Sequence, residues 1–152
     1  MSLIFKSVTL DDAELIWNWI IDETVKSASF SNKNISLSEH CEWVKNKINS
    51  IDTQLLLVKE DEQALGQIRI DQIDSATYLS IVLAPKARGR GLGVEILNTA
   101  VARIAKDGIK EIFAQIRQDN LRSQKAFERA GFNRIADLEQ NQIKGFLYRR
   151  LV

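Results

Sequence analysis

The sequence is poor in residues that build covalent or metal-centred frameworks, with one cysteine, Cys41, and one histidine, His40. A single cysteine excludes a disulfide framework and a cysteine-based zinc site, and we expect no bound metal. The two residues are adjacent, so on a helix their side chains point about 100° apart. That divergence argues against a cysteine–histidine nucleophile pair.

Long apolar runs and a large excess of one charge are also missing. No apolar stretch reaches the ~18 residues of a membrane span, and the N-terminus shows no basic-then-apolar leader. The net charge of +1 gives no reason to expect nucleic acid or an anionic membrane as a partner. We therefore expect a cytoplasmic protein, monomeric or homodimeric, with one domain over 1–152.

The most informative segment that is present runs from Arg88 to Gly93 and reads Arg-Gly-Arg-Gly-Leu-Gly. It follows an apolar run over 78–83 and precedes a helical pattern over 94–105. Glycines let backbone N–H groups converge without obstruction by Cβ atoms, and a helix N-terminus adds partial positive charge. Arg88 and Arg90 add full charges, so the loop suits a pyrophosphate.

The spacing of the glycines decides between phosphate ligands. They read G-x-G-x-G, not the dinucleotide pattern G-x-G-x-x-G, and no Lys-Ser or Lys-Thr follows as in ATP-binding loops. The spacing Arg88-x-x-Gly91-x-Gly93 resembles the R/Q-x-x-G-x-G/A motif of the GNAT superfamily of acyl-CoA N-acyltransferases, where it grips the pyrophosphate of coenzyme A. An ordinary basic turn between a strand and a helix is the alternative interpretation.

A second segment, 120–132, resembles the later GNAT motif, which reads Asn-x-x-Ala/Ser, then Tyr or Phe, then Gly-Phe. On a helix, Asn120, Ser123 and Phe127 fall at i, i+3 and i+7, so they share a face that would line a cofactor channel. Gly131 would end the helix. A plain amphipathic helix with Phe127 in the core is the alternative. With both motifs in order, the chain is identified as a member of this superfamily.

Hydrophobic periodicity predicts the element order β-αα-βββ-α-β-α-ββ. Helices are expected after Asp11 or Asp12, from Ser36 or Ser38, over 92–106 and over 119–130. The expected strands cover 3–8, 53–59, 64–71, 76–83, 110–116, 132–138 and 142–151. This is the GNAT order, so the fold class is α+β: a mixed, mostly antiparallel seven-stranded sheet with helices on both faces.

The resemblance also implies how acetyl-CoA, the expected cosubstrate, binds. GNAT folds splay two neighbouring parallel strands, here 78–83 and 110–116, which frees backbone groups of the first strand for the pantetheine arm. A peptide N–H near Leu83 would polarise the thioester carbonyl. The implied coenzyme A contacts are Val82, Leu83, Arg88, Gly89, Arg90, Gly91, Leu92, Gly93, Asn120, Ser123 and Phe127.

The groups that would move protons depart from the common pattern. Many relatives carry a tyrosine seven residues after the motif's asparagine as the leaving-group acid, but this chain has Phe127. Ser123 is the local alternative, as an acid, as a hydrogen-bond donor to the thiolate, or as a small residue that lets the cofactor approach. His40, the sole imidazole, is the candidate base, with a surface or substrate-orienting role as its alternative.

Two further segments resemble acetyltransferases of nucleotide-linked 4-amino-4,6-dideoxy sugars, as in pseudaminic acid synthesis. They are Ile35-Ser36-x-Ser38-Glu39-His40-x-x-Trp43 and Gly66-Gln67-Ile68-Arg69-Ile70-Asp71. In this interpretation the substrate is a small amine, Lys26 and His40 would contact its nucleotide diphosphate, and the sugar amine would lie near Leu83. Gln67 and Arg69 are further expected substrate contacts, because their strand often lines the acceptor pocket in this superfamily.

Two other functions stay open at this point. The spacing Asn120-x-x-Ser123 resembles the branch that acetylates ribosomal-protein N-termini, so a peptide or protein N-terminus is an alternative acceptor. A GNAT-fold module that binds coenzyme A without turnover is the alternative of another class, because the tyrosine is missing.

Overall fold

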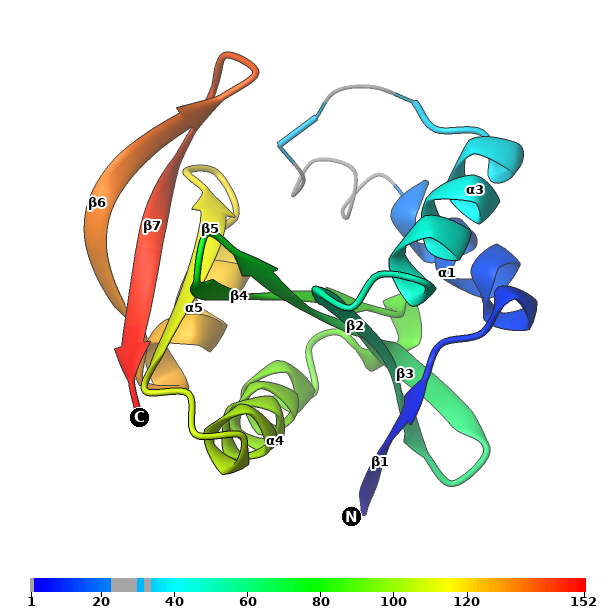
Figure 1. Ribbon diagram of the computed structural model, residues 1–152, viewed down its shortest axis with the longest axis horizontal. Coiled ribbons are helices and arrows are strands. Elements are labelled where there is room, and N and C mark those ends of the chain that lie inside the picture. Colours follow the sequence, from blue (N-terminus) through cyan, green and yellow to red (C-terminus); the bar gives the residue numbers. More distant parts are fainter. Residues whose placement is uncertain (1, 23–29, 32–33) are drawn as a thin grey trace.

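The computed structural model describes residues 2–22, 30–31 and 34–152, and its elements follow the predicted order (Figure 1). The α-helices of this part are α1 (Ala13–Ile20), α3 (Leu37–Ile48), α4 (Leu92–Lys106) and α5 (Leu121–Arg129), with short 3-10 turns at Leu10–Asp12 and Pro85–Ala87. The strands are β1 (Leu3–Ser7), β2 (Thr53–Glu60), β3 (Gln63–Ile73), β4 (Ala76–Leu83), β5 (Glu111–Arg117), β6 (Asn133–Gln140) and β7 (Ile143–Leu151).

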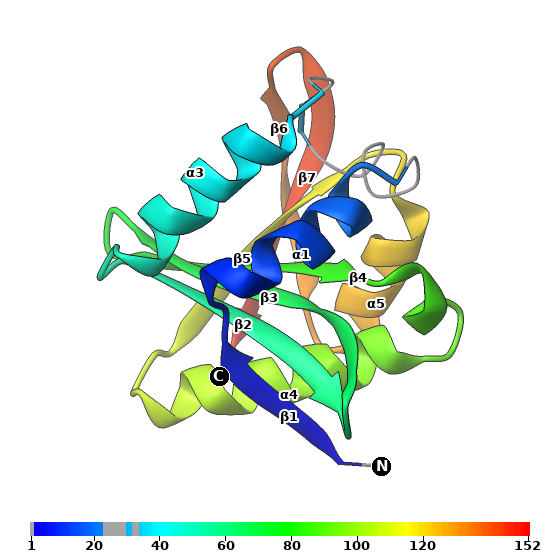
Figure 2. The ribbon, with the colours of Figure 1, turned by 90° about the vertical axis from the view of Figure 1, so that its right-hand side faces the viewer.

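The seven strands form one sheet in the order β1-β2-β3-β4-β5-β7-β6. Neighbouring strands are antiparallel except β4 and β5, which run parallel. Helices α1 and α3 cover one face, while α4 and α5 lie on the other (Figures 1 and 2). The predicted mixed sheet with helices on both faces is therefore confirmed.

The core lies on both faces of the central strands. Residues 55–58 of β2 are all buried, and consecutive residues of a strand point to opposite faces, so both faces meet apolar cover. Helix α4 supplies much of the apolar cover on its face of the sheet, with Leu92, Ile96, Leu97, Ala100, Val101 and Ile104 buried.

In the described residues no helix is long and apolar enough to cross a membrane.

Strands β4 and β5 diverge soon after they meet. They pair only at Thr77 with Ile112 and at Tyr78 with Phe113, although both strands continue well beyond these pairs. The rings of Tyr78 and Phe113 lie 5.6 Å apart between their centroids at the point of divergence. The splay implied by the family resemblance is present, and Figure 1 shows the two strands separating.

Ser36, the first of the two serines considered, is the N-cap of helix α3. The Ser36 hydroxyl accepts a hydrogen bond from the Glu39 N–H at 3.1 Å, and the Glu39 carboxylate accepts one from the Ser36 N–H at 3.1 Å. This reciprocal capping box satisfies two backbone donors that the first turn of a helix leaves unpaired. Ser38 lies inside the helix and is exposed.

We predict that Ser36→Ala lowers the free energy of unfolding by about 1 kcal/mol, because the α3 N-cap loses its side-chain acceptor. Ser38→Ala is the matched control, and we expect it to change stability by less than about 0.5 kcal/mol. Urea denaturation of both variants measures the difference. Equal stability of the two variants would show that the capping box does not stabilise α3.

Candidate active site

A cavity of about 550 Å³ opens where β4 and β5 separate. Residues 79–83 of β4 form one wall, and the glycine loop with the first turn of α4 forms its end. Residues Asn120, Ser123 and Phe127 line the side given by α5, as the i, i+3, i+7 spacing predicts. The cavity thus collects side chains from both sequence motifs.

The β4 wall presents backbone groups to this cavity. The Ala84 N–H donates to the Leu65 carbonyl at 2.8 Å, and Leu83 is opposite Gly66 in the ladder with β3. Because hydrogen-bonding direction alternates along an antiparallel strand, the peptide groups of Leu83 and Ile81 point away from β3, toward β5. Since β5 has already diverged, these groups face the cavity.

The glycine loop has the backbone conformation that its sequence suggests. Gly91 is the N-cap of α4 with φ of +73°, a left-handed value that side chains with a Cβ adopt at a cost. Apart from Gly91 itself and its chain neighbours, no heavy atom of the described residues lies within 4 Å of the position a Cβ would take there, so this edge of the loop is open. The cavity is lined by Gly89, Gly91, Leu92 and Gly93 of this loop. Arg90 does not line it, because its side chain is exposed, with the guanidinium 3.9 Å from the Glu60 carboxylate.

Arg88 lines the cavity but is tied to other parts of the fold. Its guanidinium Nη1 donates to the Asp22 carboxylate at 2.8 Å, and Nη2 donates to the Leu83 carbonyl at 3.2 Å. Asp22 follows Ile21, the C-cap residue of α1. Arg88 therefore fixes the loop against β4 and the end of α1, a structural role that the sequence motif alone did not indicate.

Helix α5 is oriented by contacts at its two ends. The Asn120 side chain accepts a hydrogen bond from the Ser123 N–H at 3.2 Å, which caps the first turn. At the other end the Tyr148 hydroxyl donates a hydrogen bond to the Glu128 carboxylate at 2.9 Å. Burial, and to a smaller extent this carboxylate, raises the pKa of Tyr148 to about 12.

Phe127 is buried edge-to-face against Phe132, with ring centroids 5.0 Å apart. Phe127 therefore serves both the core and the cavity lining.

His40 does not line this cavity. Its side chain is buried, with 1% of the residue exposed, and its ring stacks on Trp43 at 5.8 Å between centroids. Burial lowers the pKa of His40, and its Nε2 has no hydrogen-bond partner among the described residues. The alternative of a surface histidine is wrong, and the catalytic role of His40 stays a prediction.

Of the other expected substrate residues, only Arg69 is found in the cavity lining among the described residues. Gln67 is buried, and its Oε1 has no hydrogen-bond partner within the described part of the chain. Arg69 lines the cavity beside Ser80, which faces it across the ladder. Lys26 lies outside the described residues.

Phe30 lines the cavity, although it is far from the other lining residues in the sequence. Its ring lies against Gly145 of β7, where a Cβ would come within 2.5 Å of the ring Cζ atom. Its carbonyl accepts a hydrogen bond from the Asn141 side chain at 2.9 Å. Sequence reasoning missed Phe30 and Ser80, since no local pattern links either to the cavity.

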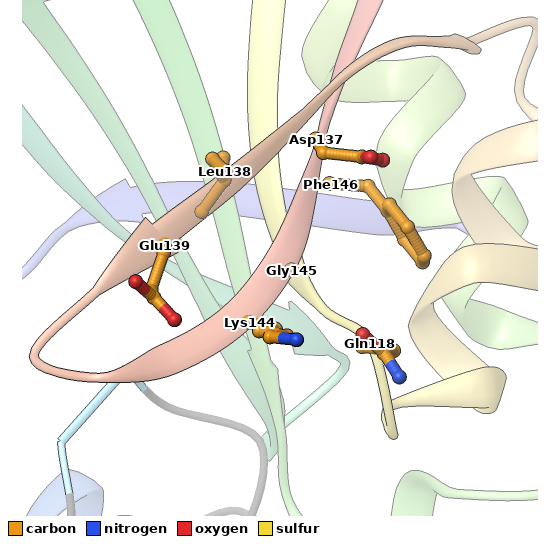
Figure 3. Close-up of a pocket in the computed structure, with 7 residues that line it drawn as sticks. All are labelled: Gln118, Asp137, Leu138, Glu139, Lys144, Gly145 and Phe146. Atoms are coloured by element: carbon orange, nitrogen blue, oxygen red, sulfur yellow. The ribbon is translucent and has the colours of Figure 1, made fainter.

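A second hollow of about 490 Å³ lies over the β6–β7 hairpin (Figure 3). The side chains of Asp137 and Phe146 project to the same side from these paired strands. Its charges have both signs, from Asp137, Glu139 and Lys144. No residue of the glycine loop or of α5 lines it, so the cavity between the splayed strands is the candidate active site.

Comparison with known proteins identifies the family of this fold. The family described as an acetyltransferase (GNAT) domain matches residues 2–133. The chain is 22% identical over 144 residues to the uncharacterized protein MJ1062 of Methanocaldococcus jannaschii, covering 92% of this chain and 30% of that relative's length.

Solved structures agree at the level of the fold. Aminoglycoside acetyltransferase AAC(6′)-Ib in complex with coenzyme A and kanamycin superposes with a TM-score of 0.86 at 14% identity, covering 99% of this chain and 95% of that one. Spermidine N-acetyltransferase from Vibrio cholerae with coenzyme A and spermine gives a TM-score of 0.86 at 17% identity, with 98% and 95% covered. The chain belongs to the acetyltransferase (GNAT) domain family.

We predict a pH dependence of stability that comes from His40. Its folded-state pKa is lowered, so the unfolded chain binds the proton first as the pH falls below about 6.5. The free energy of unfolding should be insensitive to His40 above that pH and should fall below it, by at most about 1.4 kcal/mol per pH unit.

Urea unfolding between pH 7.5 and pH 5.5 measures this dependence in the native protein and in His40→Gln. Because the chain has one histidine, the variant should lose the slope in this window, whatever its absolute stability. Parallel pH profiles for the two proteins would contradict the burial of a neutral imidazole.

Proposed function

We propose that the protein transfers the acetyl group of acetyl-CoA to a primary amine, and that the acceptor is a nucleotide-linked 4-amino-4,6-dideoxy sugar. The observation that carries the proposal is the cavity between the splayed strands, with backbone groups on one wall, an open glycine loop at its end and the α5 face beside it. Family membership supports the transfer reaction over a module that binds without turnover.

The residues present fit coenzyme A. The glycine loop has room at Gly91 for an anion to approach the backbone at the start of α4, where the helix dipole favours negative charge. The outward peptide groups of Ile81 and Leu83 are proposed to hydrogen-bond the pantetheine arm and the thioester carbonyl. Arg122, Lys125 and Arg129 line the cavity from α5 at i, i+3 and i+7, and we propose that they receive the remaining phosphate charge.

Acetyl-CoA supplies an activated carbonyl. In the reaction the unprotonated amine attacks this carbon, the C–S bond breaks, and the amine proton leaves while the thiolate gains one. The Leu83 N–H is proposed to stabilise the oxyanion. Ser123, half-buried on the cavity wall, is proposed to hydrogen-bond the thiolate, and Asn120 holds the first turn of α5 that presents it.

Charge in the cavity favours the sugar nucleotide over polycationic amines. Every ionisable side chain among the described lining residues is cationic. The cations of the glycine loop and α5 are assigned to coenzyme A, so Arg69 remains for a diphosphate-linked acceptor. No described lining residue offers a carboxylate to a polyamine or an aminoglycoside. Transfer to a peptide or protein N-terminus is the second candidate, because Ser123 lines the cavity at the position that suggested that branch.

One screen tests the acceptor class. The protein is incubated with acetyl-CoA and a panel of UDP-4-amino sugars, polyamines, aminoglycosides and short peptides, and products are detected by mass. We expect the UDP-linked 4-amino sugars to gain about 42 Da, because acyl transfer replaces an amine hydrogen by an acetyl group. We expect their acetylation to be about 10-fold faster than that of the other amines. Preferential acetylation of a polyamine or aminoglycoside would contradict the proposed acceptor.

We predict that Gly91→Val weakens coenzyme A binding at least about 10-fold, because a β-branched residue strains at φ of +73° and distorts the loop. Gly108→Val is the matched control. Gly108 has φ of +82° and equally open space, but it lies beyond the far end of α4. Titration calorimetry of both variants, each shown to fold, gives the comparison. Equal losses of affinity would indicate strain rather than a binding role for the loop.

We predict that Ser123→Ala lowers kcat by about 10-fold or more if its hydroxyl stabilises the leaving thiolate, with little change in the KM for acetyl-CoA. Thr99→Ala removes a helical hydroxyl that bonds the Glu95 carbonyl on α4, outside the cavity lining, and serves as the control. Rapid-quench measurement isolates the chemical step. An unchanged chemical rate in Ser123→Ala would exclude this role.

A further inference from the structure

Arg69 stands apart from the other cations of the cavity. Four of the five cationic lining residues belong to the glycine loop or to α5, at the end proposed for coenzyme A; the five are Arg69, Arg88, Arg122, Lys125 and Arg129. Arg69 belongs to β3, which borders β4 on the side opposite β5. Its charge therefore reaches a different part of the cavity, along the β4 wall.

The Arg69 guanidinium is held in one orientation by three contacts. Its Nε donates to the Asp71 carboxylate at 2.7 Å, and its Nη2 donates to the Ser80 hydroxyl at 3.3 Å. Its Cζ lies 5.6 Å from the ring centroid of Trp43 on α3. Asp71 is fixed in turn by the Thr53 hydroxyl at 2.9 Å. A fixed guanidinium loses little conformational entropy when it binds a ligand.

These contacts leave part of the guanidinium available. A guanidinium carries five N–H donors, and the contacts with Asp71 and Ser80 use one on Nε and one on Nη2. The two donors on Nη1 have no hydrogen-bond partner among the described residues. The Arg69 side chain is 35% exposed and lines the cavity. A rigid planar donor edge of this kind matches the oxygens of a phosphate or a carboxylate.

We propose that Arg69 is an anion anchor for the acceptor, so the amine that is acetylated belongs to a molecule that also carries a phosphate or carboxylate group. This inference rests on the proposed function, because it assigns the acceptor to the same cavity. Ser80, which holds Arg69, is three residues before Leu83 on β4, and a strand advances about 3.3 Å per residue. The anionic group then lies on the order of 10 Å from the reacting amine.

Asp71 limits how much Arg69 contributes to binding of the acceptor. Because the Asp71 carboxylate already neutralises much of the Arg69 charge, an acceptor anion is bound by directed hydrogen bonds from the guanidinium more than by long-range electrostatic attraction. The anchor therefore discriminates by geometry, and it favours a planar or tetrahedral oxyanion over a neutral hydroxyl. Amines with several positive charges gain nothing from it, which distinguishes this cavity from one that selects polyamines.

Paired acceptors test the anchor. The first pair is a UDP-4-amino-4,6-dideoxy sugar and the same amino sugar without its nucleotide. The second pair is a short peptide with a free C-terminal carboxylate and the same peptide as its C-terminal amide. We expect kcat/KM to favour the anionic member of at least one pair by about 10- to 100-fold. The pair that shows the preference identifies the phosphate or the carboxylate as the anchored group, and equal rates within both pairs would overturn the proposal.

Variants link the preference to this residue. Arg69→Gln should reduce the preference to below about 3-fold while the KM for acetyl-CoA stays the same, and Arg69→Lys, which keeps a cation for Asp71, should restore it only in part. Arg149→Gln is the matched control, because Arg149 pairs with Glu111 at 3.5 Å on β7 and does not line the cavity. An Arg69→Gln enzyme that keeps the full preference would overturn the proposal.

Direct binding keeps the anchor testable if no amine in the panel is acetylated. With coenzyme A present at saturation to fill the loop end, UDP and a carboxylate-terminated peptide are titrated into the native protein and into folded Arg69→Gln. Binding of either probe that weakens at least about 10-fold in the variant supports the anchor, even if the proposed transfer reaction fails. Absence of binding by both probes, or equal affinity in the two proteins, would overturn it.

Discussion

The ladder pairing between β4 and β5 is confined to two residue pairs, Thr77 with Ile112 and Tyr78 with Phe113, and the site depends on this restriction. A parallel ladder that continued along both strands would use the peptide groups of Ile81 and Leu83 for pairing with β5. Because the strands separate, those groups face a cavity instead. The helices that follow each strand, α4 and α5, pack against each other, so the opening is held by the packing on one face of the sheet.

The same opening determines where charge can be used. The glycine loop follows β4 and α5 follows β5, so their cations are brought to one end of the cavity by the connectivity of the chain. Arg69 comes from β3 and is directed by its ladder position opposite Ser80. The two groups of cations thus arise from different structural causes, which is why they can serve the cosubstrate and the acceptor separately.

Much of this architecture could be predicted from local sequence. The element order follows from hydrophobic periodicity, which is a short-range property. The mostly antiparallel sheet and the common site of the two motifs were instead implied by the resemblance to the GNAT superfamily. His40 shows the limit of that reasoning. The sequence offered it as a candidate base, or as a surface or substrate-orienting residue, and nothing in the local pattern indicated burial. The structure buries its ring against Trp43, and this stacking compensates part of the cost of burying the ring.

Contacts between distant segments could not be predicted in this way, and the ion pair of Arg88 with Asp22 is the most consequential. The motif predicted an arginine that grips a phosphate, whereas the structure gives the guanidinium a carboxylate and the Leu83 carbonyl as partners. A charge that is already paired adds less attraction for an incoming anion. The positive character of the loop end therefore depends more on its backbone N–H groups and on the α5 cations, while Arg88 holds the loop, β4 and the end of α1 in the arrangement that lets those groups converge.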